Sequence, residues 1–404
     1  MTKDVLLAAI TTYYLDSRDF NGLPVVRLDI PRQQLEPMLR ALIEDGLVSI
    51  PVTVGNPHIR AFPSAPIEAQ LAELDRVDDL THVVAYPEPK HLEASVDRSA
   101  FEGQPYTLRL ALGAGQLEPA FFELSILEQY RNDPRYRYDT NETAGTISVA
   151  DEHYASEAMR EADKVILQTF GFGYDDAMHR AVCVFNRYLS DLSPEHQQIW
   201  KARELAGGYK LHPAYYASSI LGEFPDGISM FDAFLEELEL LKAMPEAVDL
   251  PPLVRESFRG RKPGNFTFLI RPTLKELQDF HATLDKMMSQ NLNKRFLVHV
   301  LGQTAAGAAD KGTIQLLEEW LGHIAPGQVA AVSETFREVR KLRQRPAHGT
   351  DDNVFDLVYY EQQRELMERS YAAARVLRLI LTSHFELAGY EVPEWLEDGK
   401  IYRY

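Results

Sequence analysis

A proline-bearing break between two helical segments constrains the last third of this 404-residue chain more than any other feature. Residues 339–345 are crowded with arginines, and Pro346 ends that segment because the residue before a proline disfavours the α region. Residues 354–386 then carry a broad apolar face at helical spacing. The sequence therefore predicts two packed helices joined by a short connection at about residues 347–352.

Two earlier segments complete the predicted helical unit. They also repeat apolar side chains at helical spacing, and helices of this kind bury their apolar faces against one another. We therefore expect a four-helix bundle within residues 272–404. Its helices are predicted at residues 274–301, 313–323, 329–345 and 354–386.

Arg343 and His348 stand on either side of the break. Arginine holds phosphate oxygens through a rigid fork of donors and never loses its charge. Histidine can take or give a proton near neutral pH. The pair therefore suits the cleavage of RNA without a metal. The alternative is structural: Arg343 would pair with Glu338 or Asp352, and His348 would cap the last helix.

The spacing from Arg343 to His348, set at a helix junction, resembles the R-x4-H signature of the HEPN superfamily. These helical bundles include bacterial ribonuclease toxins and phage-defence effectors. The resemblance covers about residues 272–386, and the residue after the arginine is Gln344, where family members usually carry Asn, Asp or His.

The resemblance implies a metal-independent endoribonuclease without a cofactor. His348 would transfer a proton, Arg343 would stabilise charge on the phosphate, and the products would be a 2′,3′-cyclic phosphate and a 5′-hydroxyl. It also implies a homodimer or higher homo-oligomer, because two facing motifs complete the acid–base set. Supporting roles in phosphate binding or in orienting the histidine fall to four nearby residues. These are Gln344, Arg345, Asn353 and Asp356.

The most basic short run of the chain precedes the bundle, in a segment at residues 251–271 that reads as a linker followed by a strand at 266–270. It would guide an RNA backbone or serve as a solvated linker. Its cationic residues are Arg255, Arg259, Arg261 and Lys262.

Composition limits which classes of protein this chain can belong to. A net charge of −18 and a pI of about 5.2 argue against a general nucleic-acid coat. The single cysteine, Cys183, excludes a disulfide framework and lies in an apolar run. No apolar stretch reaches membrane-spanning length, and no signal peptide begins the chain. We expect a cytoplasmic protein that contacts no membrane.

Residues 1–62 resemble a winged helix. Helical segments are followed by apparent strands at residues 47–52 and 59–62. A helix at residues 32–44 would enter a DNA major groove through Arg32 and Arg40, or it would contact another protein or its own chain instead. Acidic neighbours and the lack of a basic wing argue against DNA binding.

Residues 63–250 form a mixed middle region. Alternating apolar and polar residues predict strands at residues 106–112 and 145–149. Helical spacing predicts a helix at 121–130 and further helices from residue 156 onward. Three arginines and two tyrosines interleave in residues 131–138, where a turn with paired arginines is favoured over a base-stacking site. The fold class is therefore mainly α and multidomain, with α+β N-terminal and middle parts.

Three functions remain. The first is an RNA-cutting toxin or phage-defence effector, regulated by its middle region and by a partner protein or antitoxin. The second is a non-catalytic DNA-binding or partner-binding regulator whose bundle only mediates dimerisation. The third is a scaffold for a partner enzyme.

Overall fold

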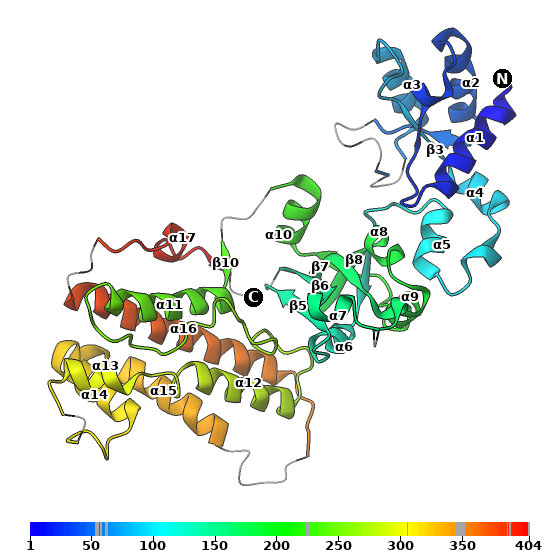
Figure 1. The fold of residues 1–404 in the computed structure, drawn as a ribbon. Coiled ribbons are helices and arrows are strands. Elements are labelled where there is room, and N and C mark those ends of the chain that lie inside the picture. Colours follow the sequence, from blue (N-terminus) through cyan, green and yellow to red (C-terminus); the bar gives the residue numbers. More distant parts are fainter. Residues whose placement is uncertain are drawn as a thin grey trace. The chain divides into compact units, whose positions relative to one another are not determined.

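The computed structural model describes residues 1–52, 56, 59–60, 64–141, 143–157, 159–223, 227–304, 306–344, 352–385, 387 and 389–402. Helices predominate over short strands, so the chain is mixed α/β and mainly helical. It divides into two compact units (Figure 1). Unit 1 comprises Met1–Ile126, Asp133–Arg137 and Thr146–His212. Unit 2 comprises Leu127–Asn132, Tyr138–Gly145 and Pro213–Tyr404. Among the described residues, no helix is both long and apolar enough to span a membrane.

The first part of unit 1 packs helices against a small antiparallel sheet. Its elements are α1 (Lys3–Asp16), β1 (Leu23–Pro24), the 3-10 turn η1 (Val25–Leu28), α2 (Arg32–Glu44), β2 (Val48–Ser49), α3 (Ile67–Arg76) and β3 (Val84–Pro87). Strand β3 lies between β1 and β2 and is antiparallel to both. The core is built by the apolar faces of α1 and α2, on which Leu6, Ile10, Leu39 and Leu42 are fully buried.

The expected strand at residues 59–62 is wrong where it can be tested. Ile59 and Arg60 belong to no strand, and residues 61–62 lie outside the described residues. The partner of β2 is β3, with Val48 opposite Pro87. The chain inserts α3 between these strands, and local alternation cannot reveal a partner that lies beyond an intervening helix.

The second part of unit 1 is built on a larger sheet with the strand order β4-β8-β7-β6-β5, and β9 also pairs with β7. The strands are β4 (Pro119–Phe122), β5 (Tyr136–Thr140), β6 (Ala144–Val149), β7 (Ile166–Tyr174), β8 (Arg180–Phe185) and β9 (Lys210–Leu211). The remaining helices of unit 1 are α4 (Pro89–Ser95), α5 (Pro105–Ala111), α7 (Asp151–Tyr154), α8 (Asn186–Ser190) and α9 (Pro194–Lys201). The tip of the β5–β6 hairpin and α6 (Glu128–Arg131) are grouped with unit 2.

Of the local predictions for this region, the strand at residues 145–149 is confirmed, as β6. Residues 106–112 form most of α5, because Pro105 starts a helix and Tyr106 and Leu110 bury the same face. The predicted helix at 121–130 is instead β4 followed by two short helical turns. The helical pattern expected from residue 156 is interrupted by β7 and β8, whose aromatic and β-branched residues suit a buried sheet.

Unit 2 is the helical part of the chain. Its longer helices are α11 (Met230–Glu246), α12 (Leu274–Met287), α13 (Lys294–Val300), α14 (Thr313–Ile324), α15 (Val329–Gln344) and α16 (Val358–His384). Short elements are α10 (Pro213–Tyr216), η5 (Ala217–Leu221), β10 (Ile228–Ser229), η6 (Pro326–Gln328), α17 (Glu394–Glu397) and β11 (Ile401–Tyr402). Side-chain oxygens of Ser229 and Thr273 cap α11 and α12 by accepting hydrogen bonds from the backbone N–H groups of Asp232 and Glu276.

Two predictions for unit 2 are wrong. The helix expected at residues 274–301 is two helices, α12 and α13, interrupted at residues 288–293. The strand expected at 266–270 is absent from this described segment, although all five residues are buried. The other three predicted helices of the bundle correspond to α14, α15 and α16.

Helix α11 packs along α16, and α15 contacts both α12 and α16. A buried ion pair joins α11 to α16: Arg378 Nε donates to Glu237 Oε2 at 2.6 Å, and the two side chains are 4% and 0% exposed. Burial raises the pKa of Glu237, and the hydrogen bond from Arg378 opposes that rise. Because a charge is buried in a protein only where it is paired, α11 and α16 are fixed to one another at this point.

Candidate functional site

Arg343 lies one residue before the end of α15, on the helix face that packs against α12. It follows Val339 by four residues, and Val339 in turn continues a buried stripe that contains Val332 and Phe336. Its Nη1 atom lies 3.3 Å from Oδ2 of Asp285 on α12. The guanidinium therefore joins two helices, while the Arg343 side chain remains 44% exposed.

Asp285 is a fully buried acid. Its Oδ1 accepts a hydrogen bond from the Ser289 hydroxyl, and its Oδ2 accepts one from Gln290 Nε2 at 2.5 Å. Together with Arg343, three donors surround this carboxylate. The sequence predictions did not include Asp285, although a signal existed: it follows His281 by four residues on the apolar stripe of α12.

The acids expected to pair with Arg343 do not do so. Glu338 instead accepts hydrogen bonds from Arg369 of α16, and the acid that pairs with Arg343 is Asp285. Helix geometry explains the difference, because Glu338 and Arg343 are five residues apart and point away from one another.

The other motif residues are described in part. Gln344 is the exposed last residue of α15. Arg345 and His348 lie outside the described residues.

The segment that follows is attached to the start of α12. Asn353 Oδ1 accepts a hydrogen bond from Lys275 N at 3.0 Å, and the Val354 carbonyl accepts one from Leu274 N at 2.8 Å. Asp356 Oδ1 accepts a hydrogen bond at 3.0 Å from the backbone N–H of Val358, the first residue of α16. Through Arg343 on one side and Asn353 on the other, both flanks of residues 345–351 are tied to α12.

The basic run before the bundle is partly neutralised. Arg259 pairs with Glu236 at 3.1 Å, and Lys262 pairs with Asp232 at 2.7 Å, both on α11. Arg255 and Arg261 are exposed, and neither side chain has a hydrogen bond or ion pair with another described residue. Two of the four cations therefore remain available to an anion.

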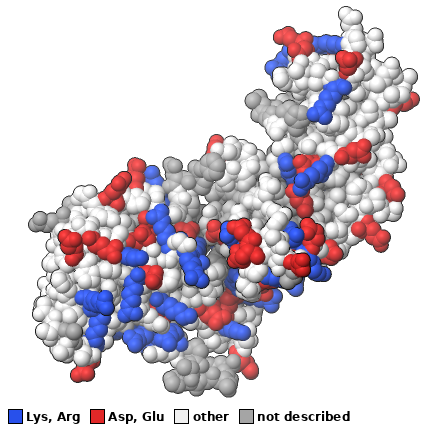
Figure 2. Space-filling view, in the orientation of Figure 1, with Lys and Arg blue, Asp and Glu red and all other residues white. Residues whose placement is uncertain are grey.

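Exposed cations also gather on the last turns of α15. Arg340 and Lys341 are exposed and have no ionic partner among the residues that the structure describes. Figure 2 shows Lys and Arg side chains collecting over the helices of unit 2. This part of an acidic chain is locally positive, and Arg343 belongs to the same helix end.

The arginines of α2 are held within unit 1. Arg32 donates to Glu36 and to the carbonyls of Leu74, Val77 and Asp78, while Arg40 pairs with Glu36 and Asp75. The hydrogen bonds from Arg32 and Arg40 hold the pKa of Glu36 below its usual value. A helix whose guanidinium groups are engaged with neighbouring acids and carbonyls offers little free charge to a DNA backbone.

The arginines of residues 131–138 are likewise paired. Arg135 forms a bidentate pair with Asp133, and Arg137 pairs with Asp151. Arg131 pairs with Glu276 at the start of α12. The interpretation of these residues as a turn with paired arginines is confirmed.

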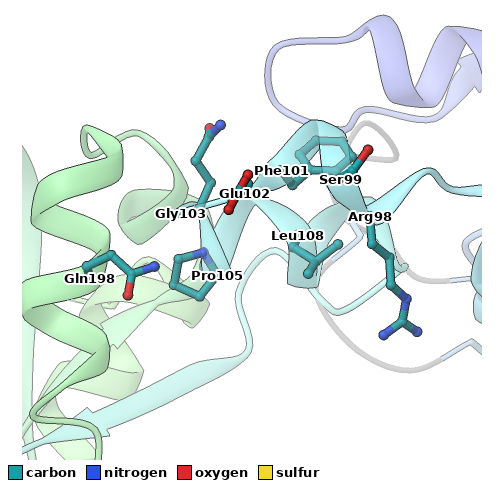
Figure 3. Close-up of a pocket in the computed structure, with 9 residues that line it drawn as sticks. Arg98, Ser99, Phe101, Glu102, Gly103, Pro105, Leu108 and Gln198 are labelled. Atoms are coloured by element: carbon teal, nitrogen blue, oxygen red, sulfur yellow. The ribbon is translucent and has the colours of Figure 1, made fainter.

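Unit 1 has a surface hollow at the start of α5 (Figure 3). Arg98 and Gln198 lie toward opposite ends of it, with Glu102 and Gln104 as further polar residues. It contains none of the residues that the sequence singled out. Within the described parts of the chain, no group of three or more His, Cys, Asp or Glu residues is arranged to hold a metal ion.

Comparison with known proteins adds no relative: no family model, no curated protein and no solved structure matches this chain.

Proposed function

We propose that the helical bundle of unit 2 is a metal-independent endoribonuclease of the HEPN type. The observation that carries the proposal is the presentation of Arg343: its guanidinium is held at one nitrogen by buried Asp285, yet the side chain is 44% exposed at the end of α15. His348 follows Arg343 by five residues in the sequence, and Asn353 beyond it is bound to α12. This arrangement brings a fixed positive charge and a titratable imidazole close together in the sequence.

The proposed reaction is an internal transesterification. The ribose 2′-oxygen attacks the adjacent phosphorus, the bond to the 5′-oxygen breaks, and a 2′,3′-cyclic phosphate and a 5′-hydroxyl result. His348 takes the 2′-hydroxyl proton or supplies a proton to the leaving 5′-oxygen. Arg343 stabilises the negative charge that grows on the phosphate oxygens. Arg340 and Lys341 extend the positive surface along which the RNA backbone would lie.

A second copy of the chain would complete the acid–base pair. One chain supplies a single motif histidine, whereas the reaction needs both an acid and a base. An apolar patch on the bundle supports this assembly, because Val354, Phe355, Leu357 and Val358 are 48%, 65%, 54% and 39% exposed. The patch directly follows the motif in the sequence, so a dimer formed through it would bring two motifs near each other.

The wider role that we propose is a toxin or phage-defence effector, with unit 1 as the regulatory or partner-binding part. The patch at residues 354–358 also favours a second candidate, a non-catalytic regulator whose bundle only dimerises. The paired state of Arg32 and Arg40 favours a protein partner over DNA for unit 1.

The test is RNA cleavage by the purified full-length chain. Arg343→Ala and His348→Ala are each expected to abolish cleavage, and the products of the wild-type reaction should carry cyclic phosphate ends. Arg337→Ala is the matched control on α15, since Arg337 pairs with Glu318 and faces away from Asp285. EDTA should leave the rate unchanged. Undiminished cleavage by His348→Ala, or loss of cleavage in EDTA, would overturn the assignment.

A further inference from the structure

The buried carboxylate behind Arg343 has a role that the motif itself does not describe. Asp285 is 0% exposed and lies on α12 between the buried apolar residues Leu284 and Met287. Acids are rarely buried on such a face unless something requires the charge.

Asp285 does not depend on Arg343 for its own hydrogen bonds. Ser289 and Gln290, which belong to the same turn of chain after α12, already donate to Oδ1 and Oδ2. Gln290 N also donates to the Asp285 carbonyl at 3.0 Å, which fixes the local backbone. The carboxylate is therefore oriented before the arginine arrives, and the contact acts on Arg343.

Arg343, in contrast, has one described partner. Nη1 lies 3.3 Å from Asp285, and Nε and Nη2 form no hydrogen bond with any described residue. An arginine near the end of a helix has a long, freely rotating side chain, and a guanidinium that is fixed at one edge leaves its other donors in a set direction.

We propose that Asp285 is the positioning residue of the site: it holds Nη1 of Arg343 so that the remaining donors of the guanidinium face a phosphate. This inference rests on the proposed ribonuclease function. The competing explanation is a simple link between α12 and α15, which would affect stability alone.

Asp285→Asn in the full-length chain tests the difference. The amide keeps the shape and can still accept from Ser289 but lacks the charge that attracts Arg343. We expect kcat for RNA cleavage to fall on the order of 10²-fold, with little change in KM, as for a catalytic group that is slightly misplaced. Asp279→Asn is the matched control, because Asp279 is an exposed acid on the same helix; it should cleave at the wild-type rate.

A double-variant cycle shows whether Asp285 acts through Arg343. In an Arg343→Lys background, which retains a charge but not the fork, Asp285→Asn should cause little further loss. Equal effects in both backgrounds, or a folded Asp285→Asn protein with the kcat of the Asp279→Asn control, would overturn the inference. If the Asp285→Asn protein does not fold, Asp285→Glu is used instead, because glutamate keeps the charge but displaces the carboxylate by one methylene. A wild-type kcat in the Asp285→Glu protein would also overturn the inference.

Nitrogen-15 NMR of the arginine side chains separates this inference from the proposed function. The Arg343 Nε–H signal, assigned with Arg343→Lys, should be sharp and dispersed in the wild type and should move toward the solvent-exposed position in Asp285→Asn. An immobilised Arg343 in a protein that cuts no RNA would support the positioning contact and refute the ribonuclease. A signal that does not respond to Asp285→Asn would refute the positioning contact whatever the activity.

Discussion

Replacing Arg378 by leucine should destabilise unit 2 far more than the same change at a neighbouring arginine. Arg378 is 4% exposed and donates twice to fully buried Glu237. Its loss leaves a carboxylate in the core without its hydrogen-bonded ion-pair partner, and breaking a buried pair in this way typically costs about 3–5 kcal/mol. For a unit of this size such a loss lowers the melting temperature by roughly 6–20 °C.

The matched control is Arg369→Leu on the same helix. Arg369 also pairs with a glutamate, Glu338, but the two side chains are 49% and 38% exposed. Water already screens such a pair, so its removal should cost at most about 1 kcal/mol. Thermal unfolding followed by circular dichroism measures both variants against the wild type.

The dependence on pH gives a second, independent check. Burial raises the pKa of Glu237, while the hydrogen bond from Arg378 lowers it. Without Arg378 the rise is larger, so the folded protein binds a proton that the unfolded chain has released. A carboxyl with a raised folded pKa contributes stability that is lost as pH increases through that value. The loss of stability in Arg378→Leu, relative to the wild type, should therefore be smaller in mildly acidic buffer than at neutral pH.

Replacing both partners by methionine should recover most of the loss, because an apolar pair of similar volume leaves no buried charge. Equal melting temperatures for the Arg378→Leu and Arg369→Leu proteins would refute the reasoning. A loss of stability in Arg378→Leu that becomes larger as the pH is lowered would also refute the reasoning.

Three further predictions concern other parts of the chain. Phe355→Lys should shift the assembly toward monomers in light scattering, whereas Leu379→Lys, at an exposed apolar position of α16 outside the patch at residues 354–358, should not; a monomeric wild type would contradict this. Arg32→Glu with Arg40→Glu should lower the melting temperature of unit 1, because both side chains pair within it, and the wild type should show no salt-dependent binding to duplex DNA. Burial raises the pKa of the Cys183 thiol, so a thiol reagent should react only after unfolding, and fast reaction with the native protein would argue against the buried position.

Three helices of unit 2 could be predicted from the sequence because their signals are local. Apolar residues recur at helical spacing in α14, α15 and α16, and Thr273 marks the start of α12. The interruption after α12 was missed since Leu292, Phe296 and Leu297 continue the apolar pattern across it. Periodicity indicates which residues are buried, but a chain can bury the same residues in one helix or in two.

Unit 1 was harder to predict, because its strands are short and their partners are distant. Residues 106–112 alternate as a strand would, yet they form a helix that is fixed by Pro105 and by burial of Tyr106 and Leu110. Strand β2 is two residues long and finds its partner only after α3. In such regions tertiary packing overrides the local preference.

The candidate site was predicted in part, and its contacts separate Arg343 from the other cations. In a chain of net charge −18, most arginines named by sequence reasoning are bound to acids: Arg32 to Glu36, and Arg259 to Glu236. Arg343 also has an acid, but that acid is buried and lies 58 residues away in the sequence, so no local pattern could pair the two. Glu36 is a surface acid of the same helix as Arg32 and competes directly with phosphate, whereas Asp285 is shielded from solvent and takes only one of the guanidinium nitrogens. Under the proposed function, a phosphate would meet an Arg343 that is held at one nitrogen and keeps its remaining donors unoccupied by any described residue, whereas Arg32 would first have to leave its acid.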